Sequence, residues 1–244
     1  MKKVVQFTYS IIAYLVGFAS LLLWILSVSN LIPEVSIDRT PKVSFAIAFL
    51  TNIGLVCLFA VPHSIMARKS KEFITKYIPK PIERSTYVLQ AGILLSILVI
   101  YWEPMGGLVW DFTDNQVLFY VAYVLFFLGW IILFISTFLI NHFDLFGLRQ
   151  TYLELTNKPY TELNFKVYSF YKYIRHPLYF GGILGIWATP KMTVTHLVFA
   201  ILLTSYFIIG TLFEERDLIK EFGEKYKDYK KKTPMLIPFT KFKK

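Results

Sequence analysis

Apolar residues occur in long runs along most of the chain, and short polar stretches separate one run from the next. A helix needs about 20 mostly apolar residues to cross the hydrocarbon core of a bilayer. Four runs are long enough, at about 7–30, 43–66, 85–102 and 116–140. The hydrophobic pattern therefore predicts an all-α membrane protein with four transmembrane helices.

A fifth apolar region, about 178–213, is interrupted by a stretch that contains Pro190. Its first limb, about 178–189, would rise only about 18 Å as a helix and is too short to cross a bilayer. The second limb, about 194–213, is long enough to span. Because proline breaks a helix interior, we expect a helix–break–helix membrane hairpin whose two ends lie on the same side of the membrane.

The segment from Arg216 to Lys232 mixes lysines with apolar and aromatic residues. This composition is typical of an amphipathic helix that lies on a membrane surface. We therefore expect a C-terminal cytoplasmic amphipathic helix in this segment. We expect Pro234 and Pro238 to end the helix and to fold the tail back over the pocket at the mouth of the hairpin.

The composition excludes an ordinary soluble domain. Hydrophobic residues make up 55% of the 244 residues and charged residues only 17%, whereas soluble domains contain about 25% charged residues. The net charge of +10 lies in short blocks between apolar runs, which is typical of loops at an anionic membrane surface rather than of nucleic-acid binding. The chain contains no internal repeat, so we expect one integral membrane domain over residues 1–244.

The charges of the loops predict how the chain is oriented in the membrane. The linker 67–84 is rich in lysine and arginine, whereas the linker 103–115 contains acidic residues and no basic ones. Cytoplasmic loops carry an excess of lysine and arginine. The N-terminus, the linker 67–84, the segment 141–177 and the C-terminal tail are therefore predicted to be cytoplasmic.

Polar side chains converge where the predicted hairpin begins and ends. The segment Arg175-His176-Pro177-Leu178-Tyr179-Phe180-Gly181 opens the hairpin, and Glu214-Glu215 follow its second limb. Pro177 suits the first turn of a helix, which places His176 at the cap beside free backbone donors. Anions are disfavoured at the C-terminal end of a helix, so we expect Glu214 to pair with His176.

Small and aromatic residues near this turn have two interpretations. Gly181 and Gly185 are spaced as a GxxxG pair, which allows close helix packing or close approach of a ligand to the backbone. Tyr171, Tyr173 and Tyr179 could offer aromatic faces to a flat ring or a cation, or lie in the interfacial belt of a membrane protein.

Three motifs in this region resemble the membrane methyltransferases typified by isoprenylcysteine carboxyl methyltransferase. The motifs are Arg175-His176-Pro177-Leu178-Tyr179-x-Gly181, Glu214-Glu215-x-x-Leu218 and Phe222-Gly223-x-x-Tyr226-x-x-Tyr229. In that family the equivalent segment binds S-adenosylmethionine at the cytoplasmic surface. The resemblance implies that six residues line the cofactor site: Tyr171, His176, Pro177, Leu178, Tyr179 and Glu214.

Longer motifs elsewhere resemble the methanethiol S-methyltransferases, within the broader NnrU-like group. They are His63-Ser64-x-Met66-Ala67-Arg68, Glu83-Arg84-Ser85-Thr86-Tyr87-Val88-Leu89, Phe143-Asp144-Leu145-Phe146-Gly147-Leu148-Arg149-Gln150 and Trp187-Ala188-Thr189-Pro190-x-Met192-Thr193. This resemblance implies S-adenosylmethionine-dependent methylation of a small thiol, with methanethiol converted to dimethyl sulfide. The expected partners are that thiol and the lipid bilayer, without nucleic acid, metal or an obligate protein partner.

The chain departs from the isoprenylcysteine enzymes at Gly210, where they place an arginine four residues before the cofactor-binding glutamate. Loss of that cation argues against a carboxylate acceptor and is compatible with a small neutral thiol. Arg175 and His176 are the catalytic candidates, because a nearby cation favours ionisation of a thiol and an imidazole can accept its proton. No obligatory base is predicted.

Other functions remain open at the level of sequence. Within the methyltransferases, the acceptor could be a prenylcysteine carboxylate or a lipid amine. A haem-binding protein or isomerase of the NnrU-like type could use His63 or His142 as an axial ligand. A transporter or structural subunit is disfavoured, because the first four predicted spans carry no charged residue near their middles.

Overall fold

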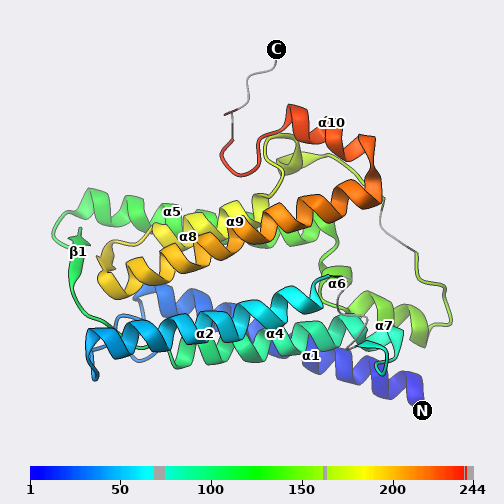
Figure 1. Ribbon diagram of the computed structural model, residues 1–244, viewed down its shortest axis with the longest axis horizontal. Coiled ribbons are helices and arrows are strands. Elements are labelled where there is room, and N and C mark those ends of the chain that lie inside the picture. The colour runs from blue at the N-terminus through cyan, green and yellow to red at the C-terminus, as the bar shows by residue number, and fades with distance from the viewer. Residues whose placement is uncertain (69–74, 162–163, 239, 241–244) are drawn as a thin grey trace. The chain divides into compact units, whose positions relative to one another are not determined.

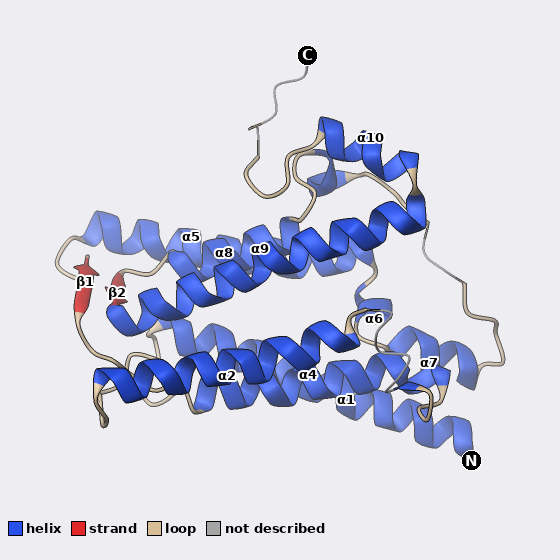
Figure 2. Ribbon diagram, in the orientation of Figure 1, coloured by secondary structure: helices blue, strands red, loops and turns tan. Residues whose placement is uncertain are grey.

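The computed structural model describes residues 1–68, 75–161, 164–238 and 240. These residues are mostly helical, with a short two-stranded sheet (Figures 1 and 2). They form two compact units, and each unit is assembled from three separate segments of the chain. Unit 1 comprises Met1–Asp111, Asn141–Thr161 and Lys191–Leu197. Unit 2 comprises Phe112–Ile140, Glu162–Pro190 and Val198–Lys244.

Unit 1 is built on three long apolar helices: α1 (Lys2–Ser29), α2 (Phe45–Met66) and α4 (Lys80–Ile100). The backbones of α1 and α4 approach closely at two glycines, since a Cβ on Gly92 would lie 2.9 Å from the Cα of Gly17. The buried hydroxyl of Ser85 donates a hydrogen bond of 2.7 Å to Ser10 between the same helices. Small residues of this kind allow apolar helices to pack closely within a membrane.

The described part of unit 1 also contains four shorter elements: α6 (His142–Leu145), α7 (Leu148–Leu155), β1 (Leu108–Asp111) and β2 (Lys191–Thr193). The two strands pair antiparallel, with Leu108 opposite Thr193. The all-α prediction missed this sheet. Strands of three or four residues carry almost no periodic signal, and the partner strand here lies far away in the sequence.

Unit 2 contains the other elements: α5 (Gln116–Ile140), the 3-10 turn η2 (Ser169–Lys172), α8 (Pro177–Trp187), most of α9 (Val194–Phe222) and α10 (Glu224–Lys232). In Figure 1, α5, α8 and α9 run alongside one another. A Cβ on Gly181 would lie 2.5 Å from the carbonyl oxygen of Gly129 on α5, and one on Gly185 would lie 2.7 Å from the Trp130 ring. Of the two interpretations of this pair, the structure supports helix packing.

Among the residues that the structure describes, five helices are long and apolar enough to cross a membrane, namely α1, α2, α4, α5 and α9. This result confirms the predicted class of a helical integral membrane protein. The helix ends differ from the prediction at α4, which begins at Lys80 instead of residue 85. At 11 residues, α8 is too short to be a span.

The prediction for the C-terminal region began its surface helix at the wrong residue. Instead of ending at residue 213, α9 continues to Phe222, and α10 is a separate helix that begins at Glu224. Glutamate, arginine, leucine and lysine are good helix formers, so the helix continues after the apolar run has ended. The break occurs at Gly223, whose φ of 57° is a conformation that glycine adopts readily.

Candidate functional site

The His-Pro turn forms as the local sequence predicts. His176 is the N-cap residue of α8 and Pro177 occupies its first turn. Proline costs no hydrogen bond at this position, because the first amides of a helix have no partner within the helix. The turn thereby places the side chains of Arg175 and His176 at the start of α8, where both are buried.

Glu215 is the buried centre of this site. Its side chain is only 2% exposed, and its Oε1 atom lies 2.6 Å from Arg175 Nε and 3.2 Å from His176 Nε2. Its Oε2 atom lies 2.7 Å from Lys230 Nζ on α10. A buried carboxylate is costly unless it is paired and hydrogen-bonded. These partners meet that requirement and join the turn, α9 and α10.

Glu214, the preceding residue, has a different environment. Its side chain is 44% exposed, and its Oε2 atom accepts a hydrogen bond of 3.0 Å from the Tyr179 hydroxyl. His176 Nδ1 lies 3.8 Å from the same oxygen. Successive helix residues point about 100° apart, which explains why one glutamate is buried while its neighbour faces outward.

The predicted pairing of His176 with Glu214 is only part of what the structure contains. The shorter contact of the imidazole is with Glu215, at 3.2 Å. The two glutamates were also expected to close a helix, but they lie inside α9, which ends at Phe222. Sequence reasoning included Glu215 in the cluster but gave it no role of its own. The available signal was Arg175, a permanent cation that requires a partner when it is buried.

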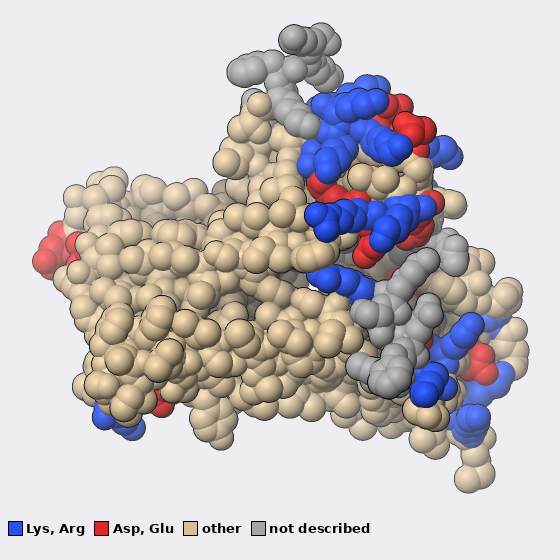
Figure 3. Space-filling view, in the orientation of Figure 1, with Lys and Arg blue, Asp and Glu red and all other residues tan. Residues whose placement is uncertain are grey.

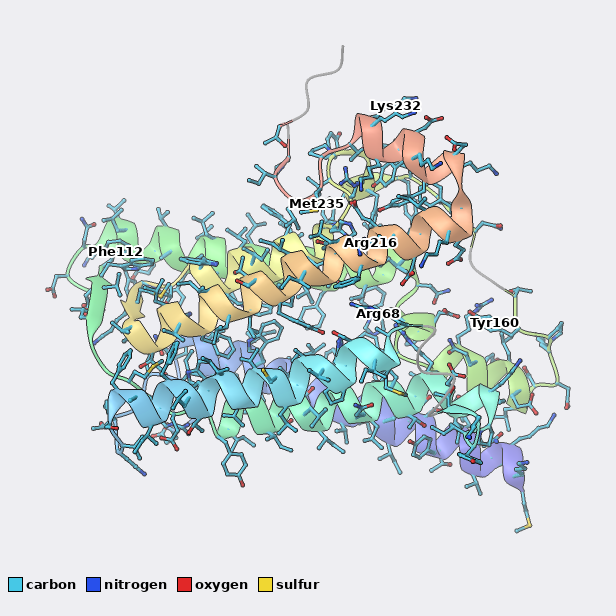
Figure 4. All side chains as sticks on the ribbon, viewed as in Figure 1. Arg68, Phe112, Tyr160, Arg216, Lys232 and Met235 are labelled. Carbon is cyan, nitrogen blue, oxygen red and sulfur yellow. The ribbon has the colours of Figure 1, made fainter. Side chains whose placement is uncertain are left out.

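The C-terminal segment after α10 closes over the His-Pro turn. The backbone amides of Arg175 and His176 donate hydrogen bonds to the carbonyl oxygens of Pro234 and Met235, at 2.9 and 3.1 Å. Arg175 Nη1 also donates to the carbonyl oxygen of Thr233. Figure 4 labels Met235, whose sulfur lies 3.7 Å from the Thr211 hydroxyl on α9. The chain therefore returns to the site, as the prolines in the tail predict.

Aromatic side chains surround the cluster. The Tyr179 ring lies between Phe207 and His176, with centroid distances of 5.4 and 5.7 Å. The backbone carbonyl of Tyr171, in η2, accepts a hydrogen bond of 2.6 Å from the Tyr229 hydroxyl. Burial and the charge of Glu214 raise the pKa of Tyr171. Its hydroxyl is therefore neutral at physiological pH and can donate a hydrogen bond.

The remaining predicted residues are also at the turn. Pro177 is buried, whereas Leu178 is partly exposed. Tyr173 is 56% exposed, which makes it the most exposed of Tyr171, Tyr173 and Tyr179. Glu214 thus contacts both His176 and Tyr179 within unit 2, and its charge contributes to the raised pKa of Tyr171.

Charged residues of unit 2 are concentrated at one end of its helices. In Figure 3, lysine, arginine and acidic side chains cover α10 and the C-terminal end of α9, whereas the middle of α9 is uncharged. Arg216, labelled in Figure 4, directly follows Glu214 and Glu215, where the charged part of α9 begins. The candidate site therefore lies where the apolar part of unit 2 ends.

The other three histidines belong to unit 1. His63 Nε2 lies 2.7 Å from the Tyr87 hydroxyl, and His142 Nε2 lies 3.0 Å from the Tyr14 hydroxyl. His196, at the start of α9, faces Asp38 at 3.4 Å. Within the described parts of the chain, no three histidine, cysteine or acidic residues are arranged to hold a metal ion.

Several bacterial enzymes are similar to this chain over nearly its whole length. It is 48% identical over 227 residues to methanethiol S-methyltransferase of Crocosphaera subtropica, and the matched residues cover 93% of this chain and 85% of the relative. It is 41% identical over 242 residues to methanethiol S-methyltransferase of Mycobacterium tuberculosis, and the matched residues cover 98% of both proteins. A more distant relative, nurim of Bos taurus, is 26% identical over 72% of this chain and 70% of its own. No family model and no solved structure matches the chain.

Proposed function

The chain belongs to the methanethiol S-methyltransferase family, and on this basis we propose that it methylates methanethiol to dimethyl sulfide with S-adenosylmethionine as the methyl donor. The observation that carries the proposal is the identity of 40–48% to proteins of that name over at least 93% of this chain. A match over 93–98% of the chain spans both units.

We assign the S-adenosylmethionine site to the His-Pro turn of unit 2, because its residues suit the donor. The half-exposed carboxylate of Glu214 can accept further hydrogen bonds beside the one from Tyr179. The faces of the Tyr179 and Tyr171 rings suit both an adenine ring and a cationic sulfur. The proposed binding residues are those implied by the family motif: Tyr171, His176, Pro177, Leu178, Tyr179 and Glu214.

The chemistry requires mainly that the reactants be held in line. Bound S-adenosylmethionine would supply a methyl group carried on a positively charged sulfur. The acceptor sulfur would bond to that methyl carbon as the thiol loses its proton, and the donor sulfur would leave as part of S-adenosylhomocysteine. Positioning alone contributes about 7–11 kcal/mol to reactions of two bound partners. An alkyl thiol ionises near pH 8.5 or above, so a local positive charge favours its reactive form.

Arg175 and His176 are the proposed catalytic residues. Arg175 contributes a permanent positive charge, and its contacts with Glu215 and two carbonyl groups fix where that charge lies. The His176 Nδ1 atom faces Glu214 rather than the buried Glu215. We therefore assign Nδ1 as the imidazole atom that can accept a proton from the ligand side.

The membrane arrangement is also part of the proposal. His176, before α8, contacts Glu214 near the far end of α9, as expected if α8 and α9 form a membrane hairpin that starts and ends on one face. The lysines of α10 favour the cytoplasmic face for this end. The aromatic residues of α10 pack on Phe165, so we propose that α10 is held at the surface by protein contacts.

We propose that residues 1–244 act as one membrane methyltransferase domain. Both compact units are assembled from three separate segments, so neither unit corresponds to a continuous stretch that could be cut out of the chain. The partners in this proposal are the small thiol and the bilayer, through which an apolar thiol can diffuse to the protein.

The test is to incubate membranes containing the protein with methyl-labelled S-adenosylmethionine and one acceptor at a time. The acceptors are methanethiol, a prenylated cysteine peptide and a lipid amine. We expect label in headspace dimethyl sulfide when methanethiol is present. Label that appears only in peptide ester or lipid would refute the thiol assignment. Membranes containing the Glu214→Ala variant provide the matched background.

A further inference from the structure

The two adjacent glutamates of α9 differ in exposure and in their partners, and only Glu214 is accessible to a ligand. Glu214 is half-exposed and contacts Tyr179, whereas Glu215 is 2% exposed and surrounded by Arg175, His176 and Lys230. A carboxylate so enclosed cannot also receive the hydroxyl or ammonium groups of a ligand. What it can do is determine the orientation of the groups that touch the ligand.

The contacts of Glu215 hold three elements in one arrangement. Its Oε1 atom binds two successive residues of the turn, Arg175 and His176, and its Oε2 atom binds Lys230 of α10. Arg175 Nη1 extends the connection, because it also donates to the Lys230 carbonyl oxygen at 3.1 Å. Any movement of the turn relative to α9 would therefore break charge-assisted hydrogen bonds inside the protein.

The same contacts determine the state of the His176 ring. In a neutral imidazole one nitrogen carries the proton, and the hydrogen bond of one nitrogen decides the role of the other. Because Glu215 is an acceptor, a proton on Nε2 makes the 3.2 Å contact a hydrogen bond. Nδ1 is then unprotonated and faces the side of Glu214, 3.8 Å away.

We propose that Glu215 is a positioning residue, which holds His176 with its proton on Nε2 and its Nδ1 atom directed to the ligand side. This inference rests on the proposed function, because the ligand is the methyl donor assigned to that site. Glu215 acts through His176 and Arg175 and does not touch the donor. The role differs from that of Glu214, which the proposed function places in contact with the ligand.

The first measurement is made on the unaltered protein in detergent, with nitrogen-15 in its histidine rings. We expect the His176 signals of a ring protonated on Nε2 and hydrogen-bonded there. Comparison with His176→Asn identifies the signals among the four histidines. A His176 ring protonated on Nδ1, at a pH where the ring is neutral, would overturn the proposal.

The second measurement compares binding of S-adenosylhomocysteine, the demethylated product, by titration calorimetry. Glu215→Gln should weaken binding roughly 10- to 100-fold, because His176 and Arg175 lose the charge-assisted hydrogen bonds that position them for the ligand, and should shift the His176 nitrogen signals. Glu221→Gln, the same change at an exposed position of α9, should alter neither quantity. Unchanged affinity and unchanged signals in folded Glu215→Gln would contradict the positioning role.

These measurements distinguish failure of the positioning role of Glu215 from failure of the proposed function. If Glu215→Gln does not fold, the nitrogen signals of the unaltered protein still decide the proposal. If the unaltered protein binds no S-adenosylhomocysteine, the donor assigned under the proposed function is wrong, whereas the ring state of His176 continues to test Glu215. Binding of the product with methylation of a different acceptor would refute only the thiol assignment.

Discussion

Glu214, which we propose to bind the methyl donor, has a side chain that solvent can reach. Its carboxylate is 44% exposed and contacts the Tyr179 hydroxyl, so its removal leaves a polar group that water can reach. The folded state should tolerate such a loss far better than loss of the buried Glu215.

The first prediction concerns this exposed carboxylate. Glu214→Ala should weaken S-adenosylhomocysteine binding at least about tenfold, because a charged acceptor is lost, while the thermal midpoint in detergent changes little. Titration calorimetry and thermal unfolding measure the two effects. The matched control is Asp217→Ala, another exposed acidic residue of α9. Binding equal to that of the unaltered protein would remove Glu214 from the site.

The second prediction concerns how the stability of the folded protein depends on pH, through the buried phenol of Tyr229. Burial raises the pKa of this phenol, whose hydroxyl donates to the Tyr171 carbonyl. The unfolded chain then loses the phenolic proton at a lower pH than the folded protein does. Stability is therefore retained below about pH 10, the ordinary phenol pKa, and declines as the pH rises above it.

Thermal midpoints measured between pH 8 and 11 test this expectation. Tyr229→Phe should reduce the decline above pH 10, because one phenol with a raised pKa has been removed. Tyr77→Phe, which alters a tyrosine that is 83% exposed, is the matched control and should leave the slope unchanged. An identical slope in Tyr229→Phe and the unaltered protein would contradict the proposed linkage.

At the scale of elements, the packing of α8 on α5 depends on glycine. A Cβ on Gly181 would lie 2.5 Å from the carbonyl oxygen of Gly129, a backbone atom that cannot move independently of its helix. At the neighbouring Gly182 the nearest atom is the edge of the Phe207 ring, at 3.3 Å. A side chain can rotate away from such a contact, whereas a helix backbone must shift as a whole.

The third prediction follows from this difference. Gly181→Ala should destabilise unit 2 by about 1–3 kcal/mol, the usual cost of overpacking, and should lower the thermal midpoint in detergent. Gly182→Ala is the matched control with the same added methyl group, and its effect should be smaller. Equal midpoints for the two variants would show that α5 and α8 do not pack closely at Gly181.

At the scale of the whole molecule, the distribution of charge along the chain predicts on which side of the membrane the candidate site lies. The charged end of unit 2 carries the candidate site, and the loop before α5 carries acidic residues without lysine or arginine. Excess basic charge marks the cytoplasmic side of membrane proteins.

The fourth prediction is the sidedness of two exposed positions. In a Cys57→Ser background, which removes the native cysteine, a membrane-impermeant maleimide should label Asp114→Cys on intact bacterial cells. It should label Lys231→Cys only after the membrane has been permeabilised. Both native residues are exposed, so access across the bilayer is what distinguishes them. The reverse pattern would place the His-Pro turn outside the cytoplasm.

Local features of the chain were predictable because their causes are local. A helix spans a bilayer because of its own length and apolarity, so the five long helices follow from composition alone. Proline suits the first turn of a helix in any protein, so the sequence around Pro177 is enough to predict that His176 is the N-cap residue. The end of α9 does not follow from the apolar pattern, because the helix continues through the charged residues 214–222 after the apolar run has ended.

The tertiary structure decided which side chains meet. Glu214 and Glu215 are equivalent in sequence, and only the packing of α9 against the turn and α10 buries Glu215 with Arg175, His176 and Lys230. In the same way, β1 finds its partner at Lys191–Thr193, far along the chain. Hydrophobicity and helix caps act between near neighbours, whereas burial and charge pairing depend on residues that only folding brings into contact.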